Sequence, residues 1–347
     1  AVVFGDHTSG YKGKYRVPID LLSSQEKDYC PLTDMDLLVH IGEVSGGYIG
    51  VRPRIVWRVN SDGELRDTHH KLTYVFEMAE QTFFTHYAEV SVSPRHGYLD
   101  ACWQALRGTW AKVSVETLPF SNVWIARETS SRIPAGSVLF LGILNSLRTW
   151  NYFDIPDTVY GYANTGGFGI DGYISSMIGA SLVHPDKLYF CVAGDLAFFY
   201  DMNVLGNRHV GRNVRILLIN NGKGTEFRNY MHPGAAFGDE ADKFIAAGGH
   251  YGNKSHQLVR HYAEDLGYEY LSADTKEEYL QNLERFLTPE ITDCPMLFEV
   301  FTNNEDESEA IRMMRNLNIS AKGVLKEAVK SAVGEKGKEF IKKMLGR

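Results

Sequence analysis

Cysteine is scarce in this chain of 347 residues, and the four that occur are far apart in the sequence. They are Cys30, Cys102, Cys191 and Cys294, and no two of them form a Cys-x-x-Cys pair. Zinc sites and redox motifs need closely spaced pairs, and disulfide frameworks are typical of small, cysteine-rich secreted domains. The sequence therefore predicts neither kind of site and favours buried free thiols in a reducing cytoplasm.

Long hydrophobic runs and an excess of basic charge are also missing. No apolar run approaches the ~18 residues that a membrane-spanning helix needs, and no signal peptide is visible. The net charge is −7 and the pI is about 6.0. Electrostatics therefore gives a nucleic-acid partner no overall support, and we predict neither a nucleic-acid nor a membrane partner.

An initiator methionine is missing as well. The first residues, Ala-Val-Val-Phe-Gly-Asp, indicate a buried strand that leads into a site loop over Asp6–Gly10. Because a chain that opens on a buried strand suggests a longer protein, we expect a further segment to precede these residues.

Apolar segments of strand length alternate with helical stretches along most of the chain. Near-continuous hydrophobic strands separated by helices indicate parallel sheets that are covered on both faces. The predicted fold is therefore α/β, with two consecutive doubly wound, mainly parallel-sheet domains and a C-terminal helical tail. These parts are expected over 1–128, 129–304 and 305–347. The strands are expected at 36–42, 55–59, 138–142, 188–192, 214–219 and 296–301.

The tail differs from the rest in composition. Its segment 322–347 has eight basic and three acidic residues, a net charge of +5, and a weak helical amphipathy. It could be a helix that docks on a partner or a membrane, or a solvated helix that folds back on the body. The second interpretation is preferred.

Two of the predicted buried strands end in residues suited to binding anions and hard metals. One ends at Gly194-Asp195 before a helix, and the other ends at Asn220-Asn221. Both ends are expected at the carboxyl edge of a parallel sheet, where α/β proteins bind ligands. Gly194 allows close approach of backbone, and the helix start after Asp195 offers free N–H groups to an anion. Since Mg²⁺ usually takes one or two protein oxygens together with phosphate and water, the pattern predicts a Mg²⁺–diphosphate site, with two ordinary strand–helix turns as the alternative.

Together the two segments resemble the signature of the thiamine-diphosphate-dependent enzymes, which starts Gly-Asp-Gly and ends Asn-Asn. In that family the Asp, the second Asn and a backbone carbonyl two positions later bind the metal. The resemblance therefore implies that Asp195, Asn221 and the carbonyl of Lys223 bind Mg²⁺.

The diphosphate of the cofactor would then lie against Gly194 and the first helical turn, at Leu196 and Ala197. Leu196 departs from the Gly of many members. The members that make succinyl-enolpyruvyl-hydroxycyclohexene-carboxylate in menaquinone synthesis also tend to have Gly-Asp-Leu, followed by an Asp-x-Asn that Asp201-Met202-Asn203 matches.

A second segment, Asn164–Tyr173, resembles the Ser-Gly-Ile-Asp-Gly segment of the same subgroup. The resemblance implies that Ile170 wedges the cofactor into its bent shape and that the carbonyl of Phe168 accepts from its amino group. The alternative is a glycine-rich loop before a buried helix, in which Ile170 only packs in the core.

The first domain resembles the central domain of these enzymes, which carries flavin in some acetohydroxyacid synthases. The glycines from Gly42 to Gly50 lack the Gly-x-Gly-x-x-Gly spacing of dinucleotide sites, so we predict no flavin and disfavour a dehydrogenase. In the family, the catalytic glutamate sits on an N-terminal pyrimidine-binding domain, normally of a partner subunit. We therefore expect a homodimer or tetramer, and we expect this chain alone to be inactive.

The resemblance implies a lyase or transferase that decarboxylates a 2-oxo acid and passes the acyl anion on. The chain also resembles acetolactate-synthase-like proteins encoded in bacterial surface-polysaccharide clusters, which implies a role in that synthesis, and a non-catalytic scaffold on the same fold is the alternative. Thr165 stands where the menaquinone enzymes have one substrate-binding arginine. For a second arginine, expected after an Asn-Ser pair, Arg148 comes two positions early and Trp150 stands nearer the expected place. This argues against 2-oxoglutarate as donor because bidentate carboxylate binding is lost. The residues that could face the substrate are Lys223, Glu226, Arg228 and His232, and a surface-loop role is the alternative for each of them.

Overall fold

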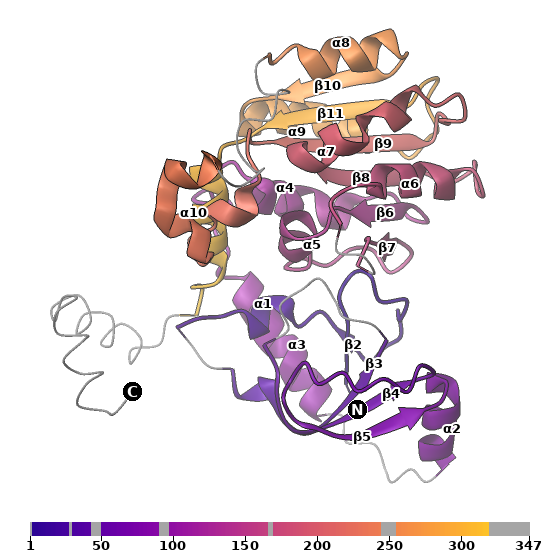
Figure 1. The fold of residues 1–347 in the computed structure, drawn as a ribbon, viewed down its shortest axis with the longest axis vertical. Helices are drawn as coiled ribbons and strands as arrows, with labels where there is room; N and C mark the ends of the chain where they lie inside the picture. The colour runs from indigo at the N-terminus through magenta and orange to yellow at the C-terminus, as the bar shows by residue number, and fades with distance from the viewer. Residues whose placement is uncertain are drawn as a thin grey trace, which may run out of the picture.

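The computed structural model describes residues 2–27, 30–42, 50–89, 97–165, 169–243 and 255–318. The described part forms two lobes, each built on parallel β-structure, and Figure 1 shows the larger lobe above the smaller one.

The larger lobe is built on a six-stranded sheet in which all neighbouring strands are parallel. The order across the sheet is β10-β11-β9-β8-β6-β7. Its strands are β6 (Val138–Leu141), β7 (Tyr160–Tyr162), β8 (Tyr189–Gly194), β9 (Val214–Asn220), β10 (Glu269–Ala273) and β11 (Met296–Phe301).

Both faces of this sheet are buried, because alternate side chains of its central strands enter two separate hydrophobic clusters. In β9, for example, Leu217 and Ile219 join one cluster while Ile216 and Leu218 join the other. One face packs against α4 (Asn122–Thr129), α5 (Asn145–Trp150), α9 (Lys276–Phe286) and α10 (Asn304–Met314), and the other against α6 (Tyr173–Ser181), α7 (Asp195–Asp201) and α8 (Leu258–Asp265). A sheet covered on both faces accounts for the uninterrupted apolar runs of its strands.

The smaller lobe holds a three-stranded parallel sheet in the order β3-β4-β5. Rings of β4, β5 and the helix α2 gather around Trp57, whose ring lies 5.5 Å from that of Phe76 and 6.5 Å from that of Phe83. The elements of this lobe are β1 (Val3–Phe4), β2 (Arg16–Val17), α1 (Asp20–Ser23), β3 (Asp34–Ile41), β4 (Arg52–Asn60), β5 (Leu72–Glu77), α2 (Glu80–Glu89) and α3 (Gly97–Trp110).

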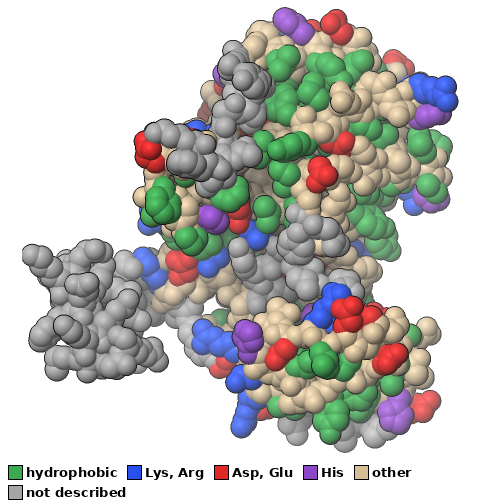
Figure 2. Space-filling view, viewed as in Figure 1, with side chains coloured by type: hydrophobic (Ala, Val, Ile, Leu, Met, Phe, Trp, Pro, Cys, Tyr) green, Lys and Arg blue, Asp and Glu red, His purple; other side chains and the backbone are tan. Residues whose placement is uncertain are grey.

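The two lobes share one hydrophobic cluster. Leu21 of α1 and Leu106 of α3 are fully buried in the same cluster as Leu147 and Trp150 of α5. The junction between the lobes is therefore part of the hydrophobic core. On the face seen in Figure 2, hydrophobic and charged side chains are interspersed over the surface of both lobes.

The prediction of an α/β chain with mainly parallel sheets is confirmed, and the six expected strands are present within a few residues of their predicted bounds. The domain bounds stay predictions. The boundary at 128/129 falls near the end of α4, whose Trp124 and Ile125 are buried in the cluster that covers the large sheet. The predicted tail begins with α10, and its residues 319–347 lie outside the described part.

The four cysteines are free thiols, of which Cys102 and Cys191 are buried. Within the residues described, no helix has the length and apolar character needed to cross a membrane.

Candidate functional site

The strand order places a topological switch point between β6 and β8. From β6 the chain moves outward to β7, and it then returns to β8 on the other side of β6. Loops at the carboxyl ends of such strands diverge and leave a crevice, which is the usual ligand site of open α/β sheets. Asp195 follows β8 directly, and the turn after β9 follows the neighbouring strand.

Asp195 joins the two turns by hydrogen bonds. It is the first residue of α7 and only 2% exposed. Its Oδ1 accepts from the backbone N–H of Leu196 at 2.7 Å, and its Oδ2 accepts from the N–H of Gly222 at 2.7 Å. Gly222 has φ = 80°, a conformation that only glycine adopts without strain, so the turn can aim its N–H at the carboxylate.

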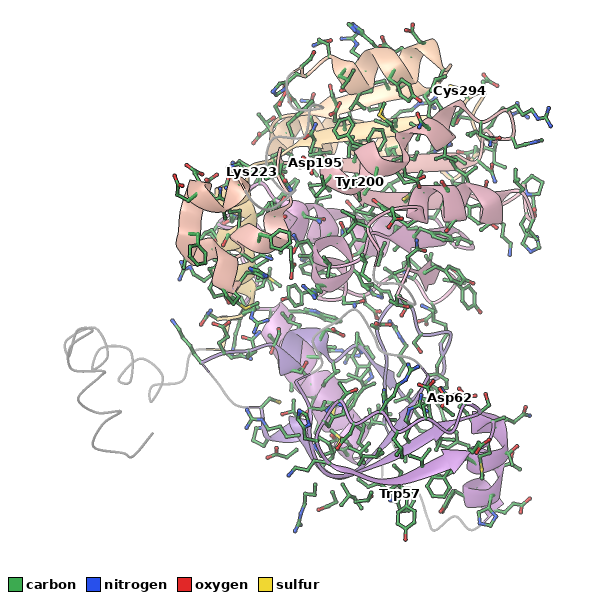
Figure 3. All side chains as sticks on the ribbon, in the orientation of Figure 1. Trp57, Asp62, Asp195, Tyr200, Lys223 and Cys294 are labelled. Atoms are coloured by element: carbon green, nitrogen blue, oxygen red, sulfur yellow. The ribbon has the colours of Figure 1, made fainter. Side chains whose placement is uncertain are left out.

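The turn after β9 holds the other two predicted metal ligands. Asn221 Oδ1 accepts from the N–H of Lys223 at 3.2 Å, which closes the turn. The Lys223 ammonium points elsewhere and pairs with Asp242 at 3.0 Å and Asp239 at 3.5 Å. Figure 3 shows Asp195 and Lys223 on the same side of the larger lobe, away from Trp57 in the smaller one.

The remaining predicted cofactor residues are distributed around this pair of turns. A Cβ atom added to Gly194 would meet nothing within 4 Å, so its backbone is open to a ligand. The N–H of Leu196 is already used by Asp195, and the Ala197 side chain is buried against the face covered by α6. Ile170 precedes α6 and packs on the same cluster, as the core interpretation expects, while Phe168 lies outside the described residues.

Tyr173, the first residue of α6, lies at the same crevice and was not predicted as a site residue. It is 1% exposed, and its hydroxyl has no hydrogen-bond partner. Burial raises the pKa of this phenol well above its ordinary value. A Cβ atom on Gly142, just after β6, would approach the Tyr173 hydroxyl to 3.3 Å, so the glycine leaves room for the ring.

Two buried carboxylates, Glu299 and Glu307, form hydrogen bonds near the two turns, and neither residue was predicted as part of the site. Glu299 of β11 accepts from Asn220 Nδ2 and from the hydroxyl of Tyr270, both at 2.7 Å. Glu307 of α10 accepts from the backbone N–H of Asn122, at the start of α4, at 3.0 and 3.1 Å. Burial raises the pKa of both groups, that of Glu307 to about 7. A lone acid inside the apolar run of β11 was a usable signal for Glu299, whereas Glu307 is hidden in an acidic helix start.

The chain has relatives among proteins of known name. It is 33% identical to the 2-succinyl-5-enolpyruvyl-6-hydroxy-3-cyclohexene-1-carboxylate synthase of Phocaeicola vulgatus over 261 residues, 75% of this chain and 44% of that protein. Enzymes of the same name from Bacteroides fragilis and Bacteroides thetaiotaomicron are 31% and 30% identical, over 75% of this chain and 45% and 44% of theirs. The chain belongs to the thiamine-diphosphate-dependent enzyme family.

The predicted resemblance is thereby confirmed at the level of the family. The chain spans less than half of the length of the relatives that it matches. No family model matches it.

Beside the two turns, this family member has a small cavity of about 150 Å³. Arg148 of α5 and Glu226 form an ion pair of 2.5 Å across its wall, and both are 17% exposed. His232 also lines it, whereas Arg228 pairs with Asp242 at 2.7 Å. Of the four residues predicted to face a substrate, Glu226 and His232 therefore reach the cavity. Its lining is Asn145, Arg148, Thr149, Tyr152, Glu226, Asn229, Met231, His232, Pro233, Ile311 and Arg315.

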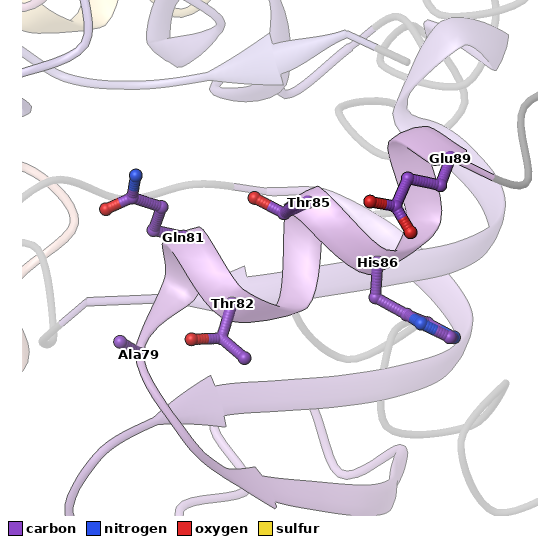
Figure 4. A pocket seen from close by; sticks show the side chains of 6 residues that line it. All are labelled: Ala79, Gln81, Thr82, Thr85, His86 and Glu89. Atoms are coloured by element: carbon purple, nitrogen blue, oxygen red, sulfur yellow. The ribbon is translucent and has the colours of Figure 1, made fainter.

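A larger and more open hollow, of about 470 Å³, lies along α2 (Figure 4). Its lining comes from one helix of the smaller lobe, including Gln81, Thr85 and Glu89. It lacks the convergence of several elements that marks a ligand site. The two turns that Asp195 joins therefore remain the candidate site.

The predicted metal site contains one carboxylate, one amide and one carbonyl. Across the described ranges, no three His, Cys, Asp or Glu side chains come together as a metal-binding group. Any metal at Asp195 would thus depend on oxygen ligands of other kinds, including those of a bound phosphate.

Proposed function

We propose that this chain holds the diphosphate of thiamine diphosphate through Mg²⁺ at Asp195, Asn221 and the carbonyl of Lys223. The observation that carries the proposal is the Asp195 carboxylate, which is buried at a switch point and bridges the turns after β8 and β9. An ionised carboxylate has about four acceptor positions, and two of these are filled by N–H groups. Carboxylate oxygens are hard ligands of the kind that Mg²⁺ takes in proteins.

The surroundings of Asp195 fit such a group. The open side of Gly194 gives a diphosphate access to the backbone, and the start of α7 favours negative charge. When bound, the cofactor supplies the electron sink that decarboxylation of a 2-oxo acid needs. Asp195 and the turn after β9 would fix its position, and the hydrophobic residue Ile170 would lie beside it.

For the reaction, we propose decarboxylation of a 2-oxo acid and transfer of the acyl anion, by a cytoplasmic lyase or transferase. The relatives are named as synthases of a succinylated cyclohexene carboxylate. In this chain Trp150 is 1% exposed and donates from Nε1 to Asn122 at 3.0 Å, so it supports the core and offers a substrate carboxylate no cation. This difference favours another donor than 2-oxoglutarate, as in an acetolactate-synthase-like enzyme, and a role in surface-polysaccharide synthesis.

The small cavity lined by Arg148 and His232 is the proposed place for the substrate. It lies next to the turn that carries Lys223, and Arg148 and Arg315 in its lining suit an anionic substrate. Turnover would further need the pyrimidine-binding domain with its glutamate. We propose that this domain comes from the same or a partner chain in a homodimer or tetramer, and that the present chain alone is inactive.

Calorimetric titration of the full-length protein with thiamine diphosphate tests the cofactor site. Binding is expected with Mg²⁺ present and not with EDTA, and Asp195→Ala should weaken it at least ~100-fold because a buried metal ligand is removed. Glu305→Gln, which alters an exposed acid on α10, serves as the matched control. Binding that needs no metal, or that survives Asp195→Ala, would refute the proposal. A decarboxylation screen over 2-oxo acids would then identify the donor.

A further inference from the structure

The loop between β1 and β2 gathers a second group of buried polar side chains, far from Asp195 in the sequence. In Figure 1 this loop lies beneath β7, where the lobes meet. A Cβ atom on Gly161 of β7 would come within 2.2 Å of the His7 carbonyl oxygen, so the loop packs directly on the strand. His7 is fully buried, and its N–H donates to Asn151 Oδ1 at 3.0 Å.

Several hydrogen-bond donors of this group are buried without an acceptor. They are the ammonium of Lys12, the Nε and Nη2 groups of Arg16, and the amide nitrogen of Asn151. Arg16 is 5% exposed and uses only Nη1, which donates to Asp154 at 2.9 Å. Burying donors and a positive charge without partners costs free energy, and native proteins rarely leave such groups unmatched.

One hydrogen-bond acceptor lies in the same group. His7 Nε2 is 2.9 Å from the carbonyl oxygen of Trp150, so Nε2 must carry the proton and Nδ1 is an acceptor. Burial lowers the pKa of His7 to about 4, which keeps the ring neutral at pH 7. Nδ1 is also buried and has no donor.

The side chains are close enough to act on one another. Burial and the Arg16 charge both lower the pKa of Lys12, and Lys12, Arg16 and Asp154 all influence the pKa of His7. The Lys12 ammonium lies 5.9 Å from the centre of the Tyr160 ring, on the neighbouring β7. Lys12 and Arg16 thus form a pair of like charges, with Asp154 bound to Arg16 at 2.9 Å and Asp157 also acting on Lys12.

We propose that the loop 5–16, with Asn151 from after α5, forms a binding site for a phosphate-type oxyanion at the lobe junction. A hydrogen phosphate offers several acceptor oxygens to the guanidinium, ammonium and amide donors, and one P–OH donor to His7 Nδ1. A carboxylate offers acceptors only, so it would leave the imidazole unmatched. Arginine binds such oxygens as a fork and lysine as a point charge, a combination common at phosphate sites.

The test is the thermal stability of the chain in phosphate, with acetate and chloride at equal ionic strength as the other arms. At 100 times the dissociation constant, phosphate is expected to raise the melting temperature by about 4 °C, and acetate and chloride by less than 1 °C. An equal rise in all three arms would overturn the proposal.

Three variants show where phosphate binds. Lys12→Met should abolish the rise, whereas Lys14→Met, an exposed lysine of the same loop, should keep it. Asp195→Ala should also keep it, because the site is separate from the one proposed for the cofactor. A rise lost in Asp195→Ala and kept in Lys12→Met would assign phosphate to the cofactor site and refute the inference.

The folding of Lys12→Met gives a second readout. Without phosphate, this variant should be at least as stable as the original chain, because it removes a buried ammonium that has no acceptor. A variant that melts several degrees lower without phosphate would show that Lys12 is a structural residue, and the inference would be wrong.

Discussion

Glu307 makes the stability of the larger lobe depend on pH in a way that one substitution can isolate. Its carboxylate is 3% exposed and accepts from Asn122 at the start of α4 and from Thr302 Oγ1 at 2.7 Å. Despite these donors, burial raises its pKa from 4.5 to about 7. Between pH 4.5 and about pH 7, Glu307 is therefore protonated in the folded state and ionised in the unfolded state.

The sign and size of the effect follow from proton linkage. Because the pKa of the acid is raised on folding, its contribution is fully present below about pH 4.5 and is lost as the pH rises through about 7. The difference between the two values corresponds to about 3 kcal/mol. With an unfolding entropy of about 2 cal/mol/K per residue, a chain of this length would lose about 4 °C in melting temperature.

Glu307→Gln imitates the protonated side chain at every pH. Urea titrations at pH 4 should give nearly the same free energy of unfolding for both proteins, and at pH 8 the variant should be more stable by about 3 kcal/mol. Glu305→Gln, on the exposed side of the same helix, should show no such crossover. A variant that is less stable at pH 8 would mean that the ionised form is the one the fold requires, and the reasoning would fail.

Three further predictions concern the crevice and its cavity. Tyr173→Phe removes a buried hydroxyl that has no partner, so without ligands the melting temperature should rise by about 1–2 °C, and a fall would show a hydrogen bond that the phenol makes. Gly222→Ala forces φ = 80° on alanine, which should cost about 1–2 kcal/mol in urea titrations and weaken thiamine diphosphate binding in calorimetry. In the full-length protein, Arg148→Met leaves Glu226 without its ion-pair partner, so the KM for an anionic substrate should rise about tenfold at unchanged kcat, and a fall in kcat alone would contradict a binding role.

The strands that carry the site could be predicted because both of their faces are buried. Every residue of β9 from Val214 to Asn220 is buried, which produces a continuous apolar run. The strand β7 escaped prediction, since it has three residues and two of them, Tyr160 and Tyr162, are about half exposed. A hydrophobic pattern in the sequence indicates which residues are buried, so a short and half-exposed edge strand is difficult to predict from it.

The candidate site shows the same limit for polar residues. Asp195 and Asn221 could be found because they follow predicted strands and resemble a known signature. The supporting residue Glu307 could not, because the sequence places it in an acidic helix start that is typical of capping. Asn303 does cap α10 by accepting from Asp306 at 2.8 Å, but the partner of Glu307 lies 185 positions away along the chain. Such a contact depends on the tertiary arrangement of α4 and α10.

The strand order has a consequence for how this chain folds while it is being synthesised. The last strand, β11, lies between β9 and β10, although β10 is made before it. Domains begin to fold during synthesis, so β8 and β9 can pair early while the open edge of β9 waits for Met296–Phe301. Nascent chains that stall before residue 296 would expose that edge, which is a template for intermolecular pairing. Synthesis of β11, and not of the cofactor turns, is then the step that covers the open edge of β9.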